Sequence, residues 1–316
     1  MKEYKLIFKP LSTISKLPNA QTIFGAICNI ISHTQGETAF QEYIQSFNSE
    51  PWFIHSSMFP LHLLPMIHYN IFSIEYINKI MLQHKAEDEL AYLQKMKTYK
   101  KIRYIHEDIY QQFIVDRQFE ELQANLLNNK LAIQDGCLCK KDLQVDNQVR
   151  QLNTHVRRKD YYLEKGDNNA LYYDESIYTD SLFYILVKTN KSKVDIKNIF
   201  SYTEYFGFGA RHSVGKNSFK LVGIEEVGYK RNNEYKVLLS QSILDDTFVL
   251  DQSYYQIDSK KYHPSFTYIN KTTHRMNLFN EGSYFKVKGS KEWVGKLLTF
   301  EINDKPLYYY AIGYII

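Results

Sequence analysis

Cysteine is scarce in this sequence, which has only Cys28, Cys137 and Cys139 among 316 residues. Three cysteines cannot form the disulfide framework that stabilises small secreted domains. Cys137 and Cys139 lie next to no second cysteine pair and to no histidines at ligand spacing, so we expect no metal site.

Proline and glycine are also few, at 7 and 13 residues, which excludes a low-complexity or linker-rich chain. Long apolar runs are missing as well, since the stretch Leu61–Phe72 is interrupted by two histidines, a proline and an asparagine. A membrane span needs about 18 uninterrupted apolar residues. The charged start Met1–Lys5 lacks the apolar core of a signal peptide, so we expect a cytoplasmic protein that contacts no membrane.

An excess of one charge is absent too, because 39 lysines and arginines face 35 acidic residues for a net charge of +4. That balance does not mark a nucleic-acid binder, so a basic site has to come from local clustering. The chain is rich in aromatic residues, with 27 tyrosines and 19 phenylalanines. Stacking on RNA is one explanation, but codon bias of an A/T-rich genome is another, and we give the second more weight.

Hydrophobic periodicity alternates between strand and helix, which indicates an α+β fold, and the length allows about two domains. Asn19 is expected to cap a helix over Ala20–His33 that buries four isoleucines on one face, and Asp195 to cap a helix that ends near Tyr205. Other helices are expected over 38–47, 74–97 and 107–127. Strands are expected over 4–8, 52–57, 101–105, 149–156, 170–173, 182–187, 219–224 and 307–316.

The segment 207–216 combines three glycines with two cations, which are Gly207, Gly209, Gly215, Arg211 and Lys216. Glycines allow backbone N–H groups to approach an anion closely, and the cations add charge. The segment does not match the dinucleotide-binding fingerprint, because His212 stands where the third glycine belongs. It does not match the Walker-type phosphate-binding loop either, because the spacing before the final Gly-Lys is one residue too long. The alternative is an ordinary turn from helix to strand with a glycine cap.

The segment Asn153–Lys159 is the second candidate, with three cations beside His155 and with amide donors for phosphate or sugar. Its charged continuation to Asn169 is equally typical of a solvated surface. Motifs of metalloproteases, serine hydrolases and dithiol enzymes are absent. His155 and His212 each lie beside cations, so general acid–base cleavage of RNA is conceivable, although we expect no catalytic residue.

Four segments together resemble one branch of the RAMP (repeat-associated mysterious protein) superfamily, the subunit that caps the crRNA 5′ end in type III-A CRISPR (Csm) effector complexes. They are Thr22–Cys28 after Lys9–Ser12, Asn153–Arg158 with Ala170–Tyr173, Gly207–Lys216, and Glu281–Phe285. The sequence departs from the pattern at Asn217, where a glycine is frequent.

The resemblance implies two ferredoxin-like (RRM-like) domains over residues 1–147 and 176–316, a projecting β-hairpin thumb over 148–175, and the glycine-rich loop 207–216. It implies a non-catalytic subunit that binds the 5′ handle of crRNA and docks on the large polymerase-like subunit and on a backbone RAMP subunit. The thumb would separate guide and target RNA at the handle–guide boundary. No cofactor and no metal are implied.

The residues that the sequence assigns to RNA binding lie at the start of the first helix, in the thumb and in the loop. They are Asn19, Thr22, Asn153, Thr154, His155, Arg157, Arg158, Gly207, Gly209, Arg211, His212, Ser213, Gly215 and Lys216. We expect Arg211→Ala or Lys216→Ala to weaken handle binding and to leave the fold intact.

Three alternatives to this function stay open on the sequence. The first is a crRNA-processing endoribonuclease of the same superfamily, with His155 or His212 as acid or base. The second is the equivalent capping subunit of a type III-B complex. The third is a structural protein that binds no RNA, which would leave the loop of glycine and arginine without a purpose.

Overall fold

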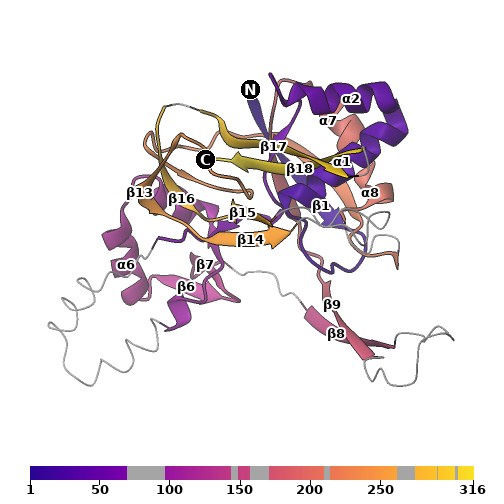
Figure 1. Ribbon diagram of the computed structural model, residues 1–316. Helices are drawn as coiled ribbons and strands as arrows, with labels where there is room; N and C mark the ends of the chain where they lie inside the picture. The colour runs from indigo at the N-terminus through magenta and orange to yellow at the C-terminus, as the bar shows by residue number, and fades with distance from the viewer. Residues whose placement is uncertain are drawn as a thin grey trace, which may run out of the picture.

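The computed structural model describes residues 1–69, 97–143, 149–156, 171–209, 214–261, 275–289, 291–302 and 305–316. The fold mixes helices and strands, as the sequence predicts (Figure 1). The helices are α1 (Ala20–Gln35), α2 (Glu37–Ser46), α5 (Glu107–Ile109), the π-helical turn η1 (Tyr110–Ile114), α6 (Phe119–Leu127), α7 (Lys193–Phe200) and α8 (Thr203–Phe206). Most of the helix expected over 74–97 lies outside the described residues.

The strands form one larger sheet and several small ones. In chain order they are β1 (Lys2–Pro10), β2 (Ile54–His55), β3 (Phe59–Pro60), β4 (Leu63–Pro65), β5 (Tyr104–His106), β6 (Leu131–Gln134), β7 (Cys137–Lys140), β8 (Val149–Val156), β9 (Leu171–Tyr178), β10 (Phe183–Thr189), β11 (Phe219–Glu226), β12 (Tyr235–Val237), β13 (Phe248–Tyr254), β14 (Ile257–Lys261), β15 (Arg275–Phe279), β16 (Tyr284–Val287), β17 (Trp293–Ile302) and β18 (Lys305–Tyr314).

The larger sheet has the strand order β11-β1-β10-β2, with β3 pairing on β10 as well. Its elements follow the chain as β1, α1, β2, β10, α7 and β11, so two β-α-β units share one sheet although about 120 residues separate β3 from β10. Every residue of β10 is buried, as expected for a strand that is covered on both faces.

This sheet crosses the boundary that the sequence predicts at residues 148–175. β1 pairs with β10 from Lys2 opposite Thr189 to Phe8 opposite Phe183, and it pairs with β11 along its other edge. Strands from residues 1–147 and from residues 176–316 therefore share this sheet. Local periodicity carries no information on which distant strands pair, so the sequence does not predict this pairing.

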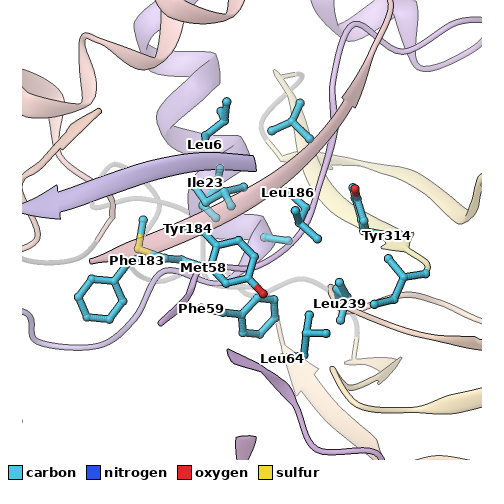
Figure 2. Close-up of a cluster of buried hydrophobic side chains, with 14 of the residues drawn as sticks. Leu6, Ile23, Met58, Phe59, Leu64, Phe183, Tyr184, Leu186, Leu239 and Tyr314 are labelled. Carbon is cyan, nitrogen blue, oxygen red and sulfur yellow. The ribbon is translucent and has the colours of Figure 1, made fainter. Parts of the chain in front are cut away.

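The core lies on both faces of this sheet. Side chains of a strand alternate between its two faces. Figure 2 shows Leu6 and Ile23 on one side of β10, toward α1, and Tyr184 with Phe59 on the other side. Ile23 and the other three isoleucines that the sequence assigns to the buried face of α1 are fully buried, so that prediction is confirmed.

The cap of α7 differs from the prediction. The Ser192 hydroxyl caps this helix by accepting from the Asp195 backbone N–H at 3.2 Å. The Asp195 carboxylate accepts in turn from the Ser192 backbone N–H at 3.1 Å, which completes a capping box. α7 ends at Phe200, and the separate short helix α8 follows it. Because serine and aspartate both favour helix starts, the sequence alone leaves the choice of cap ambiguous.

The remaining strands form smaller units around this core. β12-β16-β13, β14-β15 and β17-β18 come from the C-terminal part, and β18 contacts α1. The sheet β4-β5-β7-β6 packs buried residues against the same core, and its strands β6 and β7 lie with helix α6 at the lower left of Figure 1. The antiparallel pair β8-β9 projects from the body at the lower right. No helix in the described residues combines the length and the apolar character that a membrane crossing needs.

A buried lysine joins β10 to the C-terminal strands. The Lys188 ammonium donates to the backbone carbonyls of Glu292 at 2.6 Å and Ile315 at 2.8 Å, and lies 4.5 Å from the centre of the Tyr314 ring. Burial lowers the pKa of Lys188 to about 7. The charged form therefore weakens the folded state at neutral pH, because an unfolded chain keeps this lysine protonated up to about pH 10.4.

We expect the free energy of unfolding to rise with pH on account of Lys188. Between its folded and unfolded pKa values the unfolded state binds more protons, so stability increases with pH, by about 2 kcal/mol from about pH 7.5 to about pH 9. Urea unfolding of the wild type and of Lys188→Met across this range measures the effect as the difference between the two slopes. Parallel slopes would refute the assignment.

Candidate functional site

The start of α1 is capped as the sequence predicts. The Asn19 side-chain oxygen accepts from the Thr22 backbone N–H at 2.9 Å. The Ala20 N–H donates to the Ser57 hydroxyl at 3.0 Å, and that hydroxyl donates to Glu281 at 2.6 Å. The amides of Ala20 and Thr22 are therefore engaged within the protein.

The glycine-rich loop packs against this first turn of α1. Gly207, Gly209 and Gly215 all have positive φ, at 62°, 77° and 81°. A Cβ atom on Gly209 would lie 2.2 Å from the Thr22 Cγ2 atom. Gly207 also ends α8 as a glycine cap. The loop is therefore both a turn from helix to strand and a place where the backbone closely approaches another segment. The structure thus brings together Thr22 and the loop, which are almost 190 residues apart.

Asn217 closes the loop onto the connection between β1 and α1. The Phe208 N–H donates to the Asn217 carbonyl at 2.9 Å, and the Asn217 amide donates to the Ser15 hydroxyl at 3.1 Å. Asn217 has a φ of 60°, a conformation that asparagine tolerates better than most residues. This geometry explains how asparagine stands at a position where the resembling family often has glycine.

Lys216 does not present its charge on the surface. Its ammonium contacts the Asp174 carboxylate and donates to the Ser176 hydroxyl at 2.7 Å. The Asn153 amide donates to the same hydroxyl at 2.8 Å. The side chains of Lys216 and Asp174 are 14% and 7% exposed. This ion pair joins the loop to β8-β9, so the charge of Lys216 is balanced within the protein here, and its contact with RNA stays a prediction.

The β8-β9 pair carries the other predicted residues. Thr154 is exposed opposite Tyr173, whose side chain is 62% exposed, and His155 lies opposite Tyr172 in the register. Reciprocal backbone hydrogen bonds of 3.0 and 2.8 Å between Ile14 and Ile177 attach the base of the pair to the body. Five of the predicted residues lie outside the described residues, namely Arg157, Arg158, Arg211, His212 and Ser213.

A cleft of about 1080 Å³ opens beside these elements. Asn19 lines it from α1, and cations line it from four other segments, namely Lys16, Arg103, Arg150 and Lys260. Arg150 pairs with Glu175 at 3.3 Å, and Lys260 pairs with Asp258 at 3.2 Å. Lys16 and Arg103 have no ion pair within the described residues.

The cations that line this cleft are not among the residues that the sequence assigns to RNA binding. Arg103 follows two lysines in the run Lys100–Arg103, which is a signal of local charge that the sequence offered. Ser57 and Glu281 gave no such signal, because only the packing of distant segments brings them to the start of α1. Within the described ranges, no group of three or more histidine, cysteine, aspartate or glutamate side chains is placed to hold a metal ion.

Solved structures with the same fold come from type III-A CRISPR complexes. A Csm3–Csm4 subcomplex of the type III-A interference complex matches with a TM-score of 0.67 and 18% identity, over 100% of this chain and 98% of the matched chain. A Csm1–Csm4 cassette in complex with pppApA matches with a TM-score of 0.59 and 18% identity, over 99% and 97%. Csm4 is the subunit that both structures contain. This chain shares its fold with a chain of each of these two complexes.

The resemblance found in the sequence is therefore confirmed at the level of the fold. No family model matches the sequence, and no curated protein matches it. The motif Glu281–Phe285, one of the segments that carried the resemblance, has a structural role here. Gly282 has a φ of 85°, and a Cβ atom on it would lie 2.3 Å from the Met66 carbonyl oxygen. The motif thus holds the C-terminal strands against the segment that follows β4.

Asn19→Ala is expected to lower the free energy of unfolding by about 1 kcal/mol, because the first turn of α1 loses its cap. Asn19→Asp keeps an acceptor oxygen and adds a charge that the helix dipole favours, so it should remain close to the wild type. Urea unfolding of the two variants tests this. Equal losses in both would show that the cap hydrogen bond contributes little.

Proposed function

We propose that this protein is a non-catalytic RNA-binding subunit of a type III CRISPR effector complex, and that it holds the 5′ handle of crRNA. The observation that carries the proposal is that the glycine-rich loop, the first turn of α1 and the β8-β9 pair meet at one place. These three segments are far apart in the sequence. A cleft large enough for single-stranded RNA lies beside them.

The proposed architecture follows the strand order. The β-α-β-β-α-β arrangement of the larger sheet corresponds to one ferredoxin-like domain, and the C-terminal strands would supply the second. β8-β9 corresponds to the thumb that separates guide and target RNA at the handle–guide boundary. The pairing of Val149–Val156 along the whole of β9 and its attachment to the body at Ile14 suit a projecting element.

RNA binding in this cleft needs little net charge. Lys16 and Arg103 supply cations without internal ion-pair partners in the described chain, and the exposed Tyr173 ring offers a stacking surface for a base. A subunit that shares its RNA with neighbouring subunits also keeps other faces for them. The proposed protein partners are the large polymerase-like subunit and a backbone RAMP subunit, by analogy with the Csm1–Csm4 and Csm3–Csm4 structures.

Affinity purification of the tagged protein from its host tests the proposal. RNA that co-purifies should have a uniform repeat-derived 5′ end, and a large polymerase-like subunit should co-purify with it. Repeat RNA that is cut by the purified protein alone would favour the endoribonuclease instead. Absence of any bound RNA would refute an RNA-binding role.

A further inference from the structure

Two histidines that the sequence did not single out lie together in the cleft. His62 is in the turn between β3 and β4, and His106 is the last residue of β5. The centres of their rings are 6.0 Å apart, and both residues line the cleft. The backbone fixes this proximity, because the Glu107 N–H donates to the His62 carbonyl at 2.9 Å and Leu63 pairs with His106.

Glu107 orients the His62 ring. The His62 Nδ1 atom lies 2.5 Å from a Glu107 carboxylate oxygen. The other oxygen accepts from Lys5 at 2.8 Å and from the Tyr229 hydroxyl at 3.2 Å. Although burial acts to raise it, the hydrogen bonds from Lys5 and His62 hold the pKa of Glu107 below its usual range. When the His62 ring is neutral, its proton is therefore on Nδ1, and Nε2 presents a lone pair.

The backbone at His62 indicates a ligand site rather than packing alone. Its φ is 63°, in the left-handed region that non-glycine residues rarely adopt. Such strain is found most often at active sites and ligand clamps. The His62 side chain is 55% exposed, so no burial of apolar surface compensates for the strain.

The His106 ring has the opposite hydrogen-bonding role. Its Nδ1 atom accepts from the Asp108 backbone N–H at 3.2 Å, so the ring proton is on Nε2, which is a donor. Burial lowers the pKa of His106, which keeps the ring neutral at pH 7. Among the described residues, neither His62 nor His106 has a hydrogen-bond partner at Nε2.

An acceptor and a donor on rings whose centres are 6.0 Å apart match a hydroxyl group, which donates one hydrogen bond and accepts another. They match a metal ion poorly, since a metal would need the lone pair of both Nε2 atoms. A phosphate needs donors only. The ribose 2′-hydroxyl is the group by which a protein distinguishes RNA from DNA.

We propose that His62 and His106 bind a ribose 2′-hydroxyl of RNA in the cleft and thereby select RNA over DNA. This inference rests on the proposed RNA-binding function and adds a specificity site to it. Asn19 and Lys16 line the same cleft as the two histidines, so a strand that starts at the loop can reach them. Arg103 lies one residue before β5 and supplies a cation for a neighbouring phosphate.

Asparagine is the matched substitution at both positions, because its side chain keeps a polar atom near the place of Nδ1 and has nothing at Nε2. His62→Asn retains a residue that tolerates positive φ, and its amide can still donate to Glu107. His106→Asn retains an acceptor for the Asp108 N–H. The control is His33→Ala, which removes an exposed histidine of α1 that does not line the cleft.

The test measures binding of the full-length protein to a single-stranded RNA with the repeat-derived sequence of the host crRNA 5′ end, and to DNA of the same sequence. His62→Asn and His106→Asn should each weaken RNA binding about 3- to 10-fold and leave DNA binding unchanged. His33→Ala should match the wild type. One 2′-deoxy substitution in the RNA should reproduce the loss, with no further loss in the variants.

Two results would overturn the inference and leave the proposed function standing. They are equal losses for RNA and DNA, or wild-type affinity of both asparagine variants for RNA. A wild-type protein that binds no RNA would overturn the proposed function, and the hydroxyl site with it.

Discussion

Lys216→Met is expected to lower the free energy of unfolding by about 3–5 kcal/mol, which is the usual effect of removing one partner of a buried ion pair. The Asp174 carboxylate would lose the Lys216 ammonium as a partner, and the Ser176 hydroxyl would lose a donor. Because this pair attaches the glycine-rich loop to β9, we also expect the loop to become more accessible to limited proteolysis. Chemical denaturation and proteolysis of the full-length protein measure both effects.

The double variant Lys216→Met with Asp174→Leu tests whether Lys216 acts in the folded protein as a partner of Asp174 or as a contact on the surface. Replacing both charges by apolar side chains also removes the Asp174 carboxylate that has lost the Lys216 ammonium, so the double variant should recover most of the lost stability. A Lys216→Met protein that is as stable as the wild type, and that has lost only RNA affinity, would restore the interpretation of Lys216 as a phosphate contact. The structure predicts instead that Lys216→Met loses stability.

Gly209→Ala is expected to destabilise the protein by about 2–5 kcal/mol and to weaken RNA binding. An alanine at a φ of 77° costs about 1–2 kcal/mol of backbone energy. Its Cβ atom would lie 2.2 Å from Thr22 Cγ2, and relief of that overlap costs a further amount of about 1–3 kcal/mol. The loop would have to move away from α1, and the arrangement beside the cleft would change.

Thr22→Ser provides the matched companion, because it deletes the Cγ2 atom that the new Cβ would meet and keeps the hydroxyl. Thr22→Ser with Gly209→Ala should therefore recover the steric part of the loss and retain the part that is due to positive φ. Thermal unfolding and RNA binding of the two single variants and the double variant form a complete cycle. Additive losses in the cycle would show that the contact between the loop and α1 is not what restricts position 209.

Local structure was largely predictable because its causes are local. Asn19 and the four buried isoleucines of α1 follow from capping chemistry and a 3.6-residue period. β1 and β10 follow from short apolar runs with β-branched and aromatic residues. At α7 the same kind of evidence failed by three residues, because Ser192 and Asp195 are both good helix-start residues.

The candidate site was predictable only in its parts. The glycines of the loop were identified because positive φ favours glycine, and all three of those assigned to the site have it. The ion pair of Lys216 was not predictable, since a lysine in a glycine-rich loop looks the same in the sequence whether its charge contacts a phosphate or Asp174. His62 and His106 gave no signal, because 44 residues separate them and neither lies in a motif.

The sequence by itself determined the start and buried face of α1, strands such as β1 and β10, and the mixed fold class, because capping and periodicity act between residues that are near one another in the chain. The tertiary structure alone decided that β1 pairs with β10 and β11, and that the loop packs on Thr22. It also decided which cations stay available at the cleft. The physical reason is that burial and pairing depend on residues far away in the sequence, and the same side chain binds a ligand or a neighbour according to what folding places beside it.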